Sequence, residues 1–89
     1  MKKLRSEINK IHKQIFKLLI KRVLVTQKIW EIKKQKNIKL TDLKREQEII
    51  HMFDHHKKIK NNSELKKMVQ KIQKTILTEN IKYLKNENR

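Results

Sequence analysis

The chain contains no cysteine, no glycine and no proline among its 89 residues. Without cysteine it has no disulfide and no thiolate metal site, which suits a reducing compartment such as the cytoplasm. Without glycine and proline it lacks the residues that tight turns and sheet corners usually require. Aromatic residues make up only 4%, too few for a base-stacking platform that binds nucleic acid. These absences favour helices joined by short polar loops.

Long apolar runs are absent too. No stretch approaches the roughly 18 to 20 consecutive apolar residues that span a bilayer. The lysine-rich start is not followed by the apolar region and cleavage site of a signal peptide. We therefore expect a cytoplasmic protein with no membrane partner. The chain is long enough for one domain, residues 1–89, whose own core would be small, so burial against a second chain would help to stabilise it.

Basic residues outnumber acidic ones by 25 to 9, and the formal net charge is +16. Such a charge alone suggests nucleic acid, an anionic membrane or a small anion as partner. Lysine supplies 21 of the 25 and is spread along the whole chain, as an AT-rich coding sequence would produce. A basic helical dimer that binds nucleic acid through counterion release is thus one alternative. Retention of arginine at Arg5, Arg22 and Arg45, in a chain that otherwise uses lysine, argues against it.

The apolar residues from Leu4 to Ile32 recur at spacings of three and four, which predicts an amphipathic helix over about 4–35. At 1.5 Å per residue it is roughly 45 Å long, so something outside its own chain must cover its far end. A polar loop follows, and Thr41 or Asp42 can cap a second helix over about 42–57. Ser63 can cap a third over about 63–85. The predicted fold class is therefore all-α, with three helices.

Arg22 and Lys33 are eleven residues apart, about 20° in helical projection, so they share one face of the first helix. Two cations there can bracket an anion of metabolite size, although snorkelling or an ion pair with a glutamate also explains them. Arg5 precedes Arg22 by 17 residues, roughly 25 Å along the axis. The two arginines cannot easily hold one small ligand within a single chain. If Arg5 serves a comparable site, that site belongs to another chain; otherwise it is a solvated arginine.

The second helix begins with a charged run that includes Asp42, Arg45 and Glu46. Helix capping and the helix dipole explain the two acidic residues well, and a functional role is the alternative. Further along, His51 and His55 are four residues apart. No third ligand follows at a useful spacing, so we expect no metal site.

Six charged residues are spaced as in the all-helical (AroQ-class) chorismate mutases, which this chain resembles. The pattern is Leu4-Arg5-x-x-Ile8-x-x-Ile11, Ile15-x-x-Leu18-Leu19-x-x-Arg22, Lys33 and Asp42-x-x-Arg45-Glu46. The resemblance implies a three-helix protomer in an intertwined homodimer, which converts chorismate to prephenate without a cofactor or metal. It also implies that Arg5 enters the partner's site, whereas Arg22 and Lys33 come from the chain that owns the site.

The resemblance implies a role for each of these residues. The arginines, Arg45 included, would bind the two substrate carboxylates, and Lys33 would donate a hydrogen bond to the ether oxygen. Glu46 would accept a hydrogen bond from the ring hydroxyl of the substrate, and Asp42 would line the same side of the site. On the third helix the match rests on the apolar pattern alone. It places Asn80 where the family has Gln or Glu, and Ile76 where a small hydroxyl residue is common; a register shifted by one would substitute Glu79 for Asn80.

Two further alternatives share this fold. Isochorismate-pyruvate lyases reuse the same arginines and lysine, but they tend to lack equivalents of Asp42 and Glu46. An inactive member of the family is the other alternative.

Overall fold

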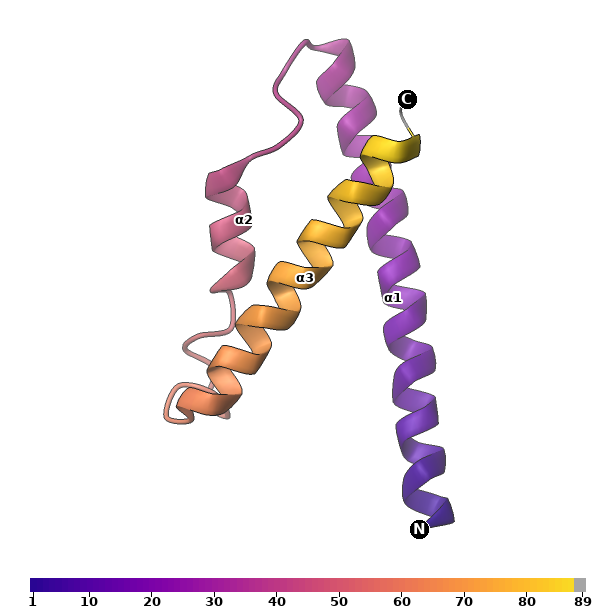
Figure 1. Cartoon of the computed structure of the whole chain (residues 1–89), viewed down its shortest axis with the longest axis vertical. Helices are drawn as coiled ribbons and strands as arrows, with labels where there is room; N and C mark the ends of the chain where they lie inside the picture. Colours follow the sequence, from indigo (N-terminus) through magenta and orange to yellow (C-terminus); the bar gives the residue numbers. More distant parts are fainter. Residues whose placement is uncertain (88–89) are drawn as a thin grey trace. The chain divides into compact units, whose positions relative to one another are not determined.

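The computed structural model describes residues 1–87, and within this range it contains three helices and no strand, as predicted. The helices are α1 (Lys2–Gln35), α2 (Leu43–Ile50) and α3 (Ser63–Glu87) (Figure 1). The chain divides after Leu40 into two compact units. The first holds α1 and the second holds α2 and α3. In the described part of the chain, none of these helices is both long enough and apolar enough to cross a membrane.

The first unit consists of α1 and the short segment that follows it. The helix ends at Gln35, as the apolar pattern predicted, and begins two residues before Leu4. Its end is closed by two hydrogen bonds, from Asn37 N to Lys34 O at 3.1 Å and from Ile38 N to Lys33 O at 2.8 Å. Asn37 has a φ of 57°. Asparagine thus takes the left-handed position that glycine usually occupies at a helix end, in a chain without glycine.

The apolar stripe of α1 is exposed along the N-terminal part of the helix, where residues 1–21 are all exposed. An isolated helix has no interior, so its apolar side chains can be buried only against another element or another chain. The exposed members of the stripe in this part of α1 are Leu4, Ile8, Ile11, Ile15, Leu18 and Leu19. Contiguous apolar surface of this kind is typical of an interaction face.

In the second unit, the cap of α2 is Asp42, one of the two predicted candidates, and not Thr41, because the carboxylate of Asp42 accepts a hydrogen bond from Arg45 N. The helix ends at Ile50, so the predicted end near residue 57 is wrong. After Ile50 the chain continues in turns, including hydrogen bonds from Met52 N to Ile49 O and from Asp54 N to His51 O. Side chains of this segment bond to α3 instead of lying along a helix surface, and such bonds compete with helical structure.

Asn62, rather than the predicted Ser63, caps α3, since its Oδ1 accepts from Leu65 N at 3.0 Å. Ser63 is itself the first helical residue. Asn and Ser are both good caps, so composition alone did not separate the two neighbours. The short helix α2 lies against α3 (Figure 1), and Gln73 on α3 donates a hydrogen bond to the carbonyl of Ile49 at 3.3 Å.

Candidate active site

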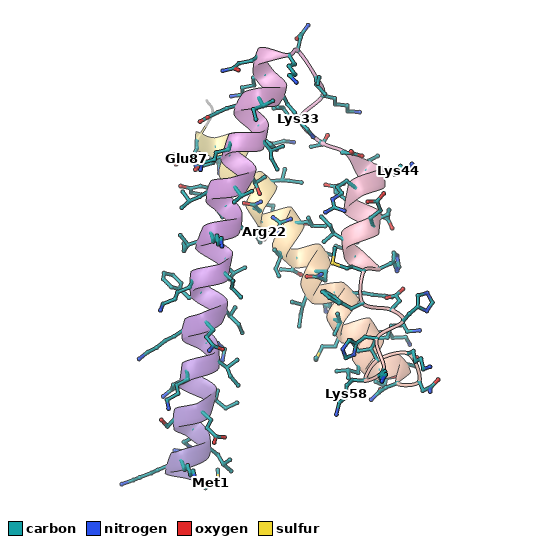
Figure 2. The ribbon with its side chains drawn as sticks, turned by 180° about the vertical axis from the view of Figure 1, so that it is seen from behind. Met1, Arg22, Lys33, Lys44, Lys58 and Glu87 are labelled. Carbon is teal, nitrogen blue, oxygen red and sulfur yellow. The ribbon has the colours of Figure 1, made fainter. Side chains whose placement is uncertain are left out.

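Of the three predicted site cations on α1, Arg22 and Lys33 are half-buried and Arg5 is exposed. Both half-buried residues lie in the C-terminal half of α1 (Figure 2). Lys33 Nζ donates a hydrogen bond to the carbonyl of Leu40, in the segment after the helix, at 3.3 Å. The helical spacing places Arg22 and Lys33 on one face, about 16 Å apart along the axis. One small anion can lie between them.

At the start of α2 the structure separates the capping role from other roles. Asp42 Oδ1 accepts from Arg45 N at 3.1 Å, so Asp42 is the cap. Glu46 is the fourth residue of the helix, one position beyond the acidic residue of a capping box. Among the described residues its side chain has no hydrogen bond or ion pair. Capping therefore explains Asp42 but not the half-buried Glu46, which as an acidic residue of the first turn interacts favourably with the helix dipole.

The guanidinium of Arg45 pairs with Glu48 at 3.1 Å. The side chains are 58% and 51% exposed, and an ion pair this exposed contributes little stability. A bound carboxylate can therefore displace Glu48 at small cost. The sequence did not indicate this local pairing, although i,i+3 spacing on a helix allows it.

Ile76 and Asn80 are one helical turn apart on α3, and both are shielded from solvent. Ile76 is half-buried, and Asn80 is 7% exposed. Glu79, the alternative if the register shifts by one, pairs with Lys82 at 3.6 Å, and its side chain is 65% exposed. Of these two adjacent candidates, the structure buries Asn80 and turns Glu79 to the surface.

His51 does not act with His55; it contacts Asp54 instead, with 2.9 Å between Nδ1 and Oδ2. Gln70 on α3 reaches the same pair, at 2.9 Å from Asp54 Oδ1 and 3.3 Å from His51 Nδ1. These hydrogen bonds, the one from Gln70 foremost, hold the pKa of Asp54 below its ordinary value of 3.8. Residues 1–87 contain no group of three or more His, Cys, Asp or Glu side chains placed to bind a metal ion.

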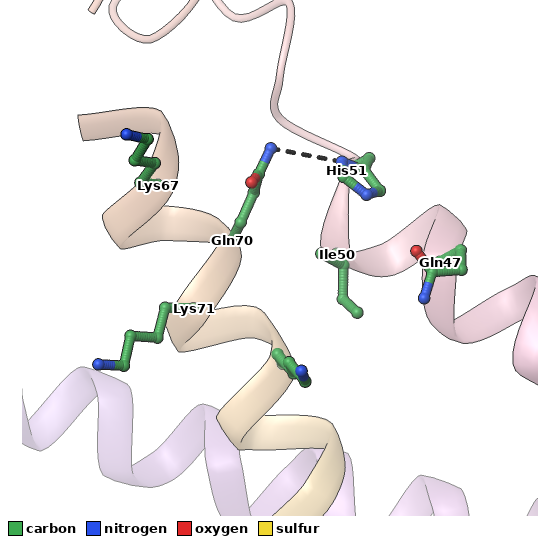
Figure 3. A pocket seen from close by; sticks show the side chains of 7 residues that line it. Gln47, Ile50, His51, Lys67, Gln70 and Lys71 are labelled. Atoms are coloured by element: carbon green, nitrogen blue, oxygen red, sulfur yellow. Dashed lines mark hydrogen bonds between the residues drawn. The ribbon is translucent and has the colours of Figure 1, made fainter. Parts of the chain in front are cut away.

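A groove that the sequence did not indicate lies between α2 and α3, with a volume of about 380 Å³. Its lining residues are Gln47, Ile50, His51, Lys67, Gln70, Lys71 and Lys74. Figure 3 shows Gln70 bonded to His51 across the groove, whereas Lys67 and Lys71 point away from α2. None of the predicted site residues lines it. The spacing of three lysines by four and three residues on α3 was the available signal.

The described part of the chain is all-helical, and its long first helix carries two half-buried cations on one face. The family described as chorismate mutase type II matches residues 4–85, across both units. The chain therefore belongs to this family, which confirms the resemblance found in the sequence. No curated protein and no solved structure gives a significant match.

Proposed function

We propose that the chain is a chorismate mutase that catalyses the [3,3] rearrangement of chorismate to prephenate, a step of aromatic amino acid biosynthesis. The observation that carries the proposal is the family match over residues 4–85, which includes all the predicted site residues. The presence of Asp42 and Glu46 favours the mutase over the lyase of the same fold. Glu46 is half-buried, and its carboxylate is available as an acceptor because the cap of α2 does not use it.

The reaction is unimolecular, so it requires neither a nucleophile nor a cofactor from the protein. The protein must hold the substrate in its compact reactive conformation and stabilise the charge that separates as the ether bond breaks. Charge-assisted hydrogen bonds from Arg5, Arg22 and Arg45 to the two substrate carboxylates would supply the first requirement. Lys33 and Asn80 would supply the second by donating hydrogen bonds to the ether oxygen.

The other site residues would complete the pocket. In this proposal Glu46 accepts a hydrogen bond from the ring hydroxyl of the substrate. Asp42 lines the same side of the site while it caps α2. Ile76 contributes apolar surface one turn before Asn80. Burial of Asn80 supports its assignment over Glu79, because a donor to the ether oxygen must be sheltered from water to act strongly.

We propose that the active form is an intertwined homodimer in which each chain, 1–89, is a single domain. Arg5 of one protomer would enter the site formed by Arg22 and Lys33 of its partner. The exposed apolar stripe of α1 supports this assembly, since burying it against a second copy stabilises the dimer by about 25 cal/mol per Å². The absence of cysteine suits a cytoplasmic enzyme.

A direct assay tests the activity. The purified chain is incubated with chorismate, and prephenate is measured after its acid conversion to phenylpyruvate. A parallel reaction contains isochorismate and is analysed for salicylate and pyruvate. We expect prephenate from the wild type and a rate at least about 100-fold lower, still measurable at high enzyme concentration, from Lys33→Ala. The matched control Lys82→Ala, on the exposed face of α3, should retain activity.

Two outcomes would replace the proposal. Salicylate and pyruvate without prephenate would identify the lyase. Steeply salt-dependent binding to a labelled DNA duplex, with neither reaction, would identify a nucleic-acid-binding protein.

A further inference from the structure

Lys33 is held by the backbone of its own unit. Its ammonium donates a hydrogen bond to the carbonyl of Leu40, seven residues later, at 3.3 Å. A lysine ammonium has three hydrogens, so this bond leaves two for other acceptors. A long flexible side chain is thereby restrained in one direction while most of its donor capacity stays available.

The turn at Asn37 brings the carbonyl of Leu40 within reach. The helix ends in a pair of hydrogen bonds, Asn37 N to Lys34 O and Ile38 N to Lys33 O. This pair of bonds requires Asn37, which follows the C-cap residue Lys36, to adopt a positive φ. Its φ is 57°. Among the described residues of this glycine-free chain, Asn37 is the one whose φ is positive. The direction of the following segment, and hence the position of the Leu40 carbonyl, depends on that conformation.

We propose that Asn37 is a positioning residue for Lys33: its left-handed conformation places the Leu40 carbonyl so that the ammonium is oriented before substrate binds. The inference rests on the proposed mutase function, in which Lys33 donates to the ether oxygen. An ammonium already in place loses less conformational freedom as the transition state forms. Asparagine adopts a left-handed conformation far more readily than a β-branched residue, which clashes there.

Kinetics of three variants test the role of the backbone conformation. Asn37→Gly removes the side chain but keeps the turn, and it should retain most of the activity. Asn37→Val opposes the turn and should lower kcat about tenfold with a smaller change in KM. Asn37→Ala should lie between them. Asn61→Val is the matched control, since Asn61 is an exposed turn residue in the second unit whose φ is not positive, and its kcat should be unchanged.

A second readout does not depend on activity. NMR of the 15N-labelled ammonium groups, with Lys33 assigned by its loss in Lys33→Arg, should show slowed exchange with water in the wild type and Asn37→Gly. The signal should be lost in Asn37→Val, while circular dichroism confirms that this variant is helical. A wild type without mutase activity would refute the proposed function but not this contact. Retention of both the signal and kcat in Asn37→Val would overturn the inference.

If Asn37 acts through Lys33, the substitution Asn37→Val should have no further effect on kcat in a Lys33→Ala background. A general loss of helix stability would instead lower the activity of both backgrounds by the same factor. Additive effects of the two substitutions would therefore contradict the positioning role.

Discussion

The side-chain amide of Gln70 on α3 donates a hydrogen bond of 2.9 Å to Oδ1 of Asp54, sixteen residues earlier in the turns after α2. The other oxygen of this carboxylate contacts His51 at 2.9 Å. The three side chains fasten the segment after α2 to the N-terminal half of α3. They also favour the ionised form of Asp54, whose pKa lies below 3.8.

This network predicts how the stability of the second unit depends on pH. Because the pKa of Asp54 is lower in the folded than in the unfolded chain, its contribution is present above pH 3.8 and is lost as the pH falls through the folded value. The urea concentration at the unfolding midpoint of the wild type should therefore decrease when the pH is lowered below about 4. The midpoint of Asp54→Asn should decrease less over the same pH range. Glu79→Gln, which removes an exposed carboxylate, is the control. An identical acid response in Asp54→Asn and the wild type would refute this role.

The cap of α2 provides a second prediction. Asp42→Ala removes the acceptor of the Arg45 N–H and should destabilise the fold by about 1 kcal/mol. Asp42→Asn keeps an acceptor and should change the free energy of unfolding by at most about 0.3 kcal/mol. Thermal unfolding measures both. If the two variants were equally destabilised, the charge rather than the hydrogen bond would be responsible.

Adjacent residues on α3 separate the two possible registers. Asn80→Ala should lower kcat about 100-fold, because it removes a donor to developing negative charge. Glu79→Ala should change kcat less than about twofold, since its exposed pair with Lys82 contributes little. The two variants differ by one position and are assayed for prephenate in parallel. The opposite ranking would assign the donor role to Glu79.

Subunit exchange tests the shared site. Arg5→Ala and Arg22→Ala should each be inactive, yet a mixed dimer retains one site that contains both arginines. An equal mixture with random exchange should therefore recover about one quarter of wild-type activity. Exchange itself is followed by mass spectrometry of differently labelled chains. Demonstrated exchange without recovered activity would place both arginines in the same chain's site.

The sequence predicted the helices well where periodicity and caps agreed. The end of α1 at Gln35 and the cap at Asp42 both follow from short-range rules that involve neighbours along the chain. The end of α2 did not follow, because the apolar pattern continues through Phe53 while His51 and Asp54 bond to Gln70. A contact across sixteen residues or more has no signature in local periodicity.

For the candidate site, the spacing of charged residues was enough to indicate the family. It could not show that Glu46 falls outside the capping box, that Arg45 pairs with Glu48, or that Asn80 is buried beside an exposed Glu79. Those distinctions depend on where each side chain points, and the helical pattern alone leaves neighbouring positions equivalent.

The order of residues by itself determined an all-helical chain, its family and the face on which Arg22 and Lys33 lie, because helix geometry converts spacing directly into direction. Tertiary structure alone decided that Gln70 on α3 bonds to His51 and Asp54 in the turns after α2. A backbone that reverses direction brings distant groups together, and that outcome depends on three-dimensional placement rather than on sequence spacing.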